Sequence, residues 1–183
     1  MMMRVVCLLI FASSVTAIHA AGNSNPGIIE TTCTKCAQRS MTTLPYCLSS
    51  LQALSISQLV SLSELGVVAM ELVEENATAT TETIQAMLDS GASGDDPFVE
   101  DSLEVCQEMY LGAIQAVEEA VNAFLTENYE AANKYMEAVQ KVADTCEAGF
   151  QEDSGKESPL AEENTNLKEL SSIVLCIIQL LSS

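Results

Sequence analysis

The chain has 183 residues and a formal net charge of −19, because 26 Asp and Glu stand against only 7 Lys and Arg. This length suits one domain with a hydrophobic core of its own. Phosphate backbones and anionic membranes are bound by clustered Lys and Arg, so the few scattered basic residues exclude nucleic acid as a partner and disfavour anionic membranes. A strongly acidic surface favours a basic partner, or serves only solubility.

Residues 1–20 have the layout of a secretory signal peptide. A charge at Arg4 precedes an apolar run at 5–12, and small residues follow. The run is too short to cross a bilayer, which takes about 20 residues. We expect cleavage after Ala20, with Ala17 and Ala21 as neighbouring alternatives. A buried N-terminal strand is the disfavoured alternative.

Cleavage after residue 20 would remove the single histidine and one of the seven cysteines, and would change the charge to −20. Secretion places the remaining thiols in an oxidising compartment, where disulfides persist. Sequence alone does not choose among the pairings that six cysteines allow. The six are Cys33, Cys36, Cys47, Cys106, Cys146 and Cys176.

A small helical hairpin is predicted for residues 28–50. Two short segments, 28–36 and 41–50, flank a polar bend at 38–40. We interpret this part of the chain as an arm attached to a larger helical body.

The first two long helices are predicted from apolar residues spaced three and four apart. One helix runs from about residue 57 to a Gly- and Asp-rich loop at 89–96. The next starts at Asp96 and Pro97, because proline is tolerated in the first helical turn. Its apolar stripe extends to Leu125.

Two further helices follow a short turn at 126–128. The apolar stripe of the third helix includes Tyr135, and that helix ends near Gly149. The fourth begins at Ser158 and Pro159 and is apolar nearly all round toward its end, so we expect it to be central. Four helices with short links predict an all-α, up-and-down four-helix bundle over residues 57–183.

The turn at 126–128 predicts one disulfide. Cys106 and Cys146 are equidistant from residue 126, and both fall on apolar stripes. Residues equidistant from the turn of an antiparallel hairpin lie opposite each other, which suits the Cα separation of about 5.5 Å that a disulfide needs.

The three cysteines of the arm leave more than one pairing open. Cys33–Cys47 and Cys36–Cys47 are both nearly symmetric about the polar bend. The C-x-x-C of Cys33 and Cys36 follows no strand, as a redox motif would, and no second pair or histidine completes a zinc site. Cys176, among apolar neighbours, is expected to be a buried free thiol.

No catalytic or metal-binding set is evident. Glu71 with Glu75 and Glu104 with Glu108 are paired carboxylates at helical spacing. Two-metal sites in bundles combine such glutamates with histidine, and the mature chain would have none. Nucleophiles activated by histidine are excluded for the same reason, so we expect solvated carboxylates, no cofactor, no metal and no enzyme.

Asn76 begins the glycosylation sequon Asn-Ala-Thr and is a candidate glycan site. A secreted, acidic, disulfide-stapled bundle of this kind is expected to work through its surface.

Several stretches resemble the plant invertase and pectin methylesterase inhibitor family, across essentially the whole mature chain. They are IIETTC at 28–33, YCLSSL at 46–51, DSLEVCQEMYLGA at 101–113, NYEAANKYMEA at 128–138 and ADTCEAGF at 143–150. CAQRS, CEAGF and the SP that opens the last helix look most like a pollen allergen of this family. The resemblance makes residues 21–183 the inhibitor domain.

The resemblance also implies a four-helix bundle with an N-terminal helical hairpin and disulfides Cys33–Cys47 and Cys106–Cys146. Cys36 then becomes an extra thiol, either unpaired or cross-linking two chains, and Cys176 a second free thiol.

The activity implied is one-to-one inhibition of a cell-wall enzyme by a protein that is otherwise a monomer. One branch of the family covers the pectin-binding cleft of pectin methylesterase with its helices, and the other inserts a Pro-Lys-Phe loop into acid invertase. The corresponding turn here contains Glu127, Asn128, Tyr129 and Glu130, without Pro-Lys-Phe. This turn is the candidate target contact, and its composition favours pectin methylesterase.

Two alternatives stay open: inhibition of an acid invertase of the cell wall or vacuole, and a non-inhibitory structural bundle or pollen allergen. An acidic inhibitor suits a basic pectin methylesterase, although charge speeds association more than it selects a target. The expected location is the apoplast or cell wall, with the vacuole as the alternative.

Overall fold

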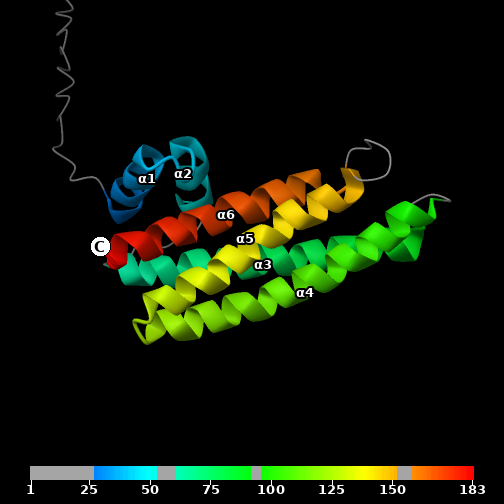
Figure 1. The fold of residues 1–183 in the computed structure, drawn as a ribbon. Coiled ribbons are helices and arrows are strands. Elements are labelled where there is room, and N and C mark those ends of the chain that lie inside the picture. Colours follow the sequence, from blue (N-terminus) through cyan, green and yellow to red (C-terminus); the bar gives the residue numbers. More distant parts are fainter. Residues whose placement is uncertain (1–26, 53–60, 92–95, 152–157) are drawn as a thin grey trace, which may run out of the picture.

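The computed structural model describes residues 27–52, 61–91, 96–151 and 158–183 (Figure 1). The predicted signal peptide lies outside the described residues. In the described part of the chain every element is a helix, as the all-α prediction required. The elements are α1 (Ile28–Gln38), α2 (Leu44–Gln52), α3 (Leu62–Ser90), α4 (Pro97–Leu125), α5 (Tyr129–Gln151) and α6 (Ala161–Leu181).

The long helices α3 to α6 form an up-and-down bundle. Helix α3 packs against α4 and α6, and α5 packs against the same two helices, so the four form a closed ring (Figure 1). The short helices α1 and α2 form a hairpin that lies along α6, with α1 toward the C-terminal end of that helix (Figure 1). The four-helix bundle with an N-terminal hairpin is therefore confirmed.

Local capping explains where α3 and α4 begin and end. The Ser61 side chain accepts a hydrogen bond from the Glu64 amide at 3.1 Å, and the Glu64 carboxylate accepts one from the Ser61 amide at 3.0 Å. This capping box starts α3. Helix α3 ends at Gly91, whose φ of 63° is a left-handed conformation that glycine adopts without strain. Helix α4 starts with Pro97, after Asp96 has capped the Phe98 amide.

Helix α6 begins later than the sequence predicts. The Ser158 hydroxyl accepts a hydrogen bond from the Leu160 amide at 3.1 Å, and the Ser158 carbonyl accepts one from Ala161 at 3.2 Å. These bonds form a turn at 158–160, so that the first helical residue is Ala161 rather than Pro159.

The core centres on α6, which is buried on all sides over residues 171–178. This confirms the central position expected from its all-round apolar sequence. Two expected members of the apolar stripes are instead exposed. Leu125 is 63% exposed, because α4 ends there, one residue past the buried Phe124, and Tyr135 lies on the outer side of α5.

Candidate target-binding surface

Two disulfides hold the elements that the sequence analysis paired. Cys33 in α1 bonds Cys47 in α2, with Cα atoms 5.6 Å apart. Cys106 in α4 bonds Cys146 in α5, with Cα atoms 5.3 Å apart. The first closes the hairpin, and the second fixes α4 against α5 within the bundle.

The expectation of free thiols at Cys36 and Cys176 is wrong, as is the idea that Cys36 links two chains. The two residues form a third disulfide, with Cα atoms 5.7 Å apart. Cys33 and Cys36 are one helical turn apart on α1, so the first can meet α2 while the second meets α6. A hydrogen bond of 2.9 Å from the Thr42 hydroxyl to Glu169 also joins the hairpin to α6.

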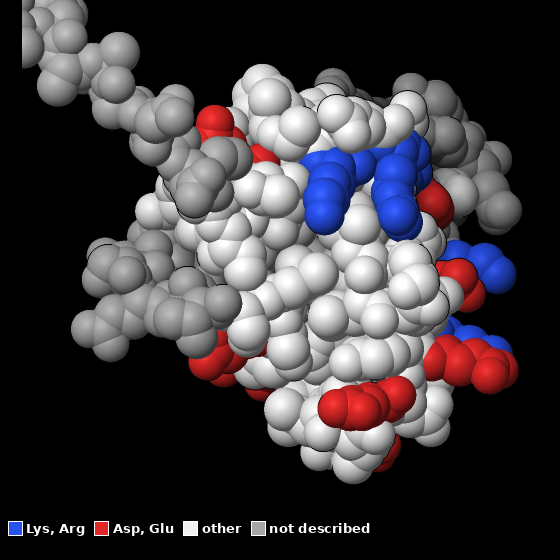
Figure 2. Space-filling view, turned by 90° about the vertical axis from the view of Figure 1, so that its left-hand side faces the viewer, with Lys and Arg blue, Asp and Glu red and all other residues white. Residues whose placement is uncertain are grey.

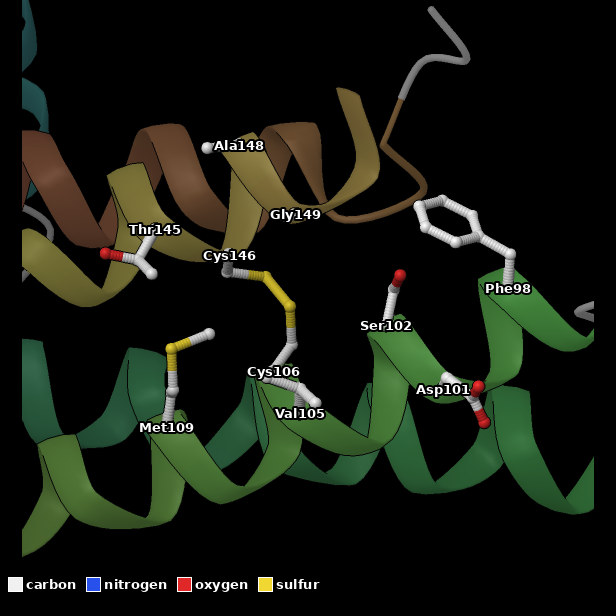
Figure 3. Close-up of a pocket in the computed structure, with 10 residues that line it drawn as sticks. All are labelled: Phe98, Asp101, Ser102, Val105, Cys106, Met109, Thr145, Cys146, Ala148 and Gly149. Atoms are coloured by element: carbon white, nitrogen blue, oxygen red, sulfur yellow. A yellow bond between two sulfur atoms is a disulfide. The ribbon is translucent and has the colours of Figure 1, made fainter. Parts of the chain in front are cut away.

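A groove lies between α4 and α5 (Figure 3). Its volume is about 500 Å³. Phe98 and Ser102 extend from α4 toward the turn of α5 that contains Gly149, and the Cys106–Cys146 disulfide lies between the two helices (Figure 3). The lining residues are Phe98, Asp101, Ser102, Val105, Cys106, Met109, Thr145, Cys146, Ala148 and Gly149.

Small residues on α5 keep this groove open. A Cβ atom placed on Gly149 would meet no other atom within 4 Å, and the adjacent Ala148 adds only a methyl group. Across the groove, Val105 is 56% exposed although it is a large apolar residue. The groove therefore offers apolar surface that no described part of the chain covers.

The charges of the molecule are divided between helices. Neither α3 nor α4 contains Lys or Arg, whereas both carry Asp and Glu along their length. In the view of Figure 2, basic side chains lie in the upper part of the molecule and at its right-hand edge, where acidic side chains lie beside them, and further acidic side chains lie toward the bottom. The basic residues of the described chain are Lys35, Arg39, Lys134, Lys141 and Lys168.

The expected contact turn lies at the other end of the same two helices. The Glu127 amide donates to Phe124 and the Asn128 amide to Ala123, which is the hydrogen-bond pattern of a Schellman helix end. The Asn128 side chain then caps α5 by accepting from the Ala131 amide at 3.2 Å. The turn is therefore fixed by backbone and side-chain hydrogen bonds, with Glu127 in the left-handed region at φ 58°. Tyr129 and Glu130 already belong to α5.

A series of buried side-chain hydrogen bonds connects α4, α5 and α6. The Tyr110 hydroxyl donates to Asn164 Oδ1 at 2.8 Å, and Asn164 Nδ2 donates to Glu147 at 2.9 Å. Burial raises the pKa of Tyr110 well above its ordinary value, and the charges of Glu163 and Glu147 add to this effect. Hydrogen bonds of this kind align the three helices.

The paired carboxylates are placed as the sequence analysis expected. Glu71, Glu75, Glu104 and Glu108 are all exposed to solvent. Among the described residues no group of His, Cys, Asp and Glu is arranged to hold a metal ion. Nor is any helix in the described ranges long and apolar enough to span a membrane.

The candidate glycan site Asn76 lies within α3 and is half-buried. Its Oδ1 atom is buried and has no hydrogen-bond partner in the described part of the chain.

The sequence alone does not single out the groove residues, although it contains two signals. Val105 is a large apolar residue outside the apolar stripe of its helix, and Gly149 lies within the last turns of a helix, where glycine is disfavoured. Both features are weak without knowledge of how α4 faces α5.

The sequence matches a family of known proteins over most of its length. Residues 27–177 match the family model described as plant invertase/pectin methylesterase inhibitor. The chain belongs to this family, whose members are inhibitor proteins and not themselves enzymes.

Two curated relatives, each named "Putative invertase inhibitor", come from Platanus acerifolia and Platanus orientalis. Both are 34% identical over 157 residues, covering 85% of this chain and 86% and 91% of the relatives. A protein from Actinidia deliciosa named "Pectinesterase inhibitor" is 27% identical over 135 residues, covering 74% of this chain and 71% of that protein.

Solved structures show the same fold. A mutant form of a pectin methylesterase inhibitor from Arabidopsis superposes with a TM-score of 0.66 at 24% identity, covering 82% of this chain and 95% of that one. A second structure of such an inhibitor, from Arabidopsis thaliana, gives a TM-score of 0.60 at 23% identity, covering 84% and 95% of the two chains.

Proposed function

We propose that this protein is a secreted inhibitor that binds a cell-wall pectin methylesterase one-to-one and covers its active-site cleft. Membership of the inhibitor family supports the class of function. The choice of enzyme depends on one observation: the turn at 127–130 has no Pro-Lys-Phe and includes Glu127 and Glu130 instead. The protein would act by occupying the cleft, without chemistry of its own.

The remaining parts of this proposal concern location and assembly. The N-terminal sequence pattern and the three disulfides favour secretion to the apoplast or cell wall, where disulfides persist. Because Cys36 is bonded within its own chain, we expect the free inhibitor to be a monomer.

Acid invertase is the second candidate target. It is favoured by the names of the two Platanus relatives, which are more similar to this chain than the pectinesterase inhibitor from Actinidia. In that case the turn at 127–130 would need to bind the invertase by contacts other than Pro-Lys-Phe.

A paired inhibition assay tests the choice. Purified mature protein is titrated against a plant pectin methylesterase and an acid invertase at mildly acidic pH, and complexes are measured by size-exclusion chromatography with light scattering. We expect loss of pectin methylesterase activity at one equivalent and no effect on the invertase. Inhibition of the invertase alone would overturn the choice of enzyme, and inhibition of neither would overturn the proposed function.

A further inference from the structure

We propose that the α4–α5 groove receives an apolar side chain that the target enzyme presents beside a Lys or Arg. This inference rests on the proposed function and specifies which surface of the inhibitor carries the binding energy. The groove residues that the proposal uses are Phe98, Asp101, Val105 and Gly149.

The size and lining of the groove suit a single protruding side chain. Most of its lining surface is apolar, and its volume of about 500 Å³ has room for the largest apolar side chains. Protein interfaces derive most of their binding energy from a few such anchors in desolvated pockets. The half-exposed Val105 would lose its remaining contact with water when an anchor is seated.

The groove is formed before binding. The Cys106–Cys146 disulfide holds its two walls at a fixed separation, and the Tyr110–Asn164–Glu147 hydrogen bonds align the next turn of the helices. A preformed pocket binds more tightly than a mobile one, because less conformational entropy is lost on association.

The charge around the groove indicates what lies beside the anchor. Asp101 is the only charged residue in the lining, and α4 contributes no Lys or Arg anywhere along its length. A partner that places a carboxylate here would be repelled, and one that places Lys or Arg here would be attracted. The occupant is therefore an apolar side chain on a basic segment.

Filling the groove from the inhibitor side tests the proposal. In Gly149→Phe the new Cβ atom meets no atom within 4 Å, and we expect the ring to occupy the groove while the helix remains folded. We expect the inhibition constant for pectin methylesterase to rise about tenfold or more, with no fall in the thermal midpoint. The matched control is Ala86→Phe, at an exposed position of α3 outside the groove, which should leave the inhibition constant within about twofold.

A second variant keeps the test valid if Gly149→Phe does not fold. Val105→Ala removes a side chain that is 56% exposed, and should weaken inhibition about threefold to tenfold without altering stability. Asp101→Lys should slow association more than Glu82→Lys, which makes the same charge change on α3.

The outcomes separate the two proposals. If the unaltered protein inhibits pectin methylesterase and Gly149→Phe and Val105→Ala inhibit it equally well, the groove inference is wrong and the proposed function stands. If the unaltered protein does not inhibit that enzyme, the proposed function fails and the groove inference fails with it.

Discussion

Asn164 is the central residue of the buried hydrogen-bond network, because both the oxygen and the nitrogen of its side-chain amide form hydrogen bonds. Its oxygen accepts from Tyr110 and its nitrogen donates to Glu147, and both Tyr110 and Asn164 are almost completely buried. A buried polar group without a hydrogen-bond partner lowers the free energy of unfolding by about 1–3 kcal/mol, so each residue of this network requires the others. The hydrogen bonds therefore favour one register of α4, α5 and α6 over a register shifted by a turn.

Replacing Tyr110 by Phe should lower the free energy of unfolding by about 1–3 kcal/mol, because Asn164 Oδ1 would lose its donor inside the bundle. Urea denaturation followed by circular dichroism measures the change. Tyr135→Phe is the matched control, since that side chain lies at the surface and should alter stability by less than about 0.5 kcal/mol. Equal effects of the two substitutions would contradict the importance of the buried hydroxyl.

The same residue predicts a pH dependence. Burial raises the pKa of Tyr110 above the ordinary value, so the folded protein holds this proton more tightly than the unfolded chain does. The associated stability is complete below pH about 10 and is lost progressively as the pH rises above it. The stability advantage of the unaltered protein over Tyr110→Phe should therefore be constant from pH 8 to about pH 10 and shrink from there to about pH 11. A constant difference across that range would show that Tyr110 does not control alkaline unfolding.

At the scale of the helix, replacing glycine by alanine should have opposite effects on stability at two positions. A Cβ on Gly66 would lie 2.5 Å from Phe124 and 3.2 Å from Ile177, both buried side chains, whereas a Cβ on Gly112 would meet nothing within 4 Å. Gly66→Ala should destabilise the protein by about 1–2 kcal/mol through overpacking. Gly112→Ala should stabilise it by up to about 1 kcal/mol through helix propensity. Thermal unfolding of the two variants compares them directly, and shifts of the same sign would be inconsistent with the packing at Gly66.

The disulfide between the hairpin and α6 should contribute strongly to stability. Cys36 and Cys176 are separated by 140 residues, whereas Cys33 and Cys47 are separated by 14. In the chain-entropy model, removing the disulfide that closes the longer loop lowers the free energy of unfolding by about 5 kcal/mol, and removing the one that closes the shorter loop lowers it by about 3 kcal/mol. Guanidinium denaturation of Cys36→Ala/Cys176→Ala and Cys33→Ala/Cys47→Ala should show this order. The reverse order would mean that native-state contacts, rather than loop entropy, dominate.

The elements that could be predicted from sequence are those set by local chemistry. Apolar spacing located the long helices, Pro97 marked the start of α4, and Cys106–Cys146 followed from symmetry about a turn. The Cys36–Cys176 bond could not be predicted, because it depends on how the hairpin lies across α6. The groove escaped prediction for a similar reason: it is a gap between two helices, formed where small residues of one helix face another.

At the scale of the whole molecule, the division of charge should control how fast the protein meets its target. All described Lys and Arg lie in α1, at the C-cap of α1, in α5 or in α6, and none lies in α3 or α4. A strongly acidic protein attracts a basic partner over distances comparable to the Debye length, which is about 10 Å at 0.1 M salt.

Association with a basic pectin methylesterase should therefore slow by roughly tenfold between low salt and about 0.5 M NaCl, with a smaller change in the dissociation rate. Surface plasmon resonance at several salt concentrations measures both rates. An association rate that does not depend on salt would indicate that the acidic surface serves solubility alone.

The third disulfide has a topological consequence. Every connection between successive helices lies between Cys36 and Cys176 in the chain, so all of them fall inside one covalent ring. A protease that cuts any single connection opens the ring without releasing a fragment, and the pieces stay joined at α1 and α6. Two cuts, or one cut followed by reduction, would be needed to separate a helix from the rest. In surroundings rich in proteases and poor in thiols, a nicked copy would keep its helices together and its groove in place.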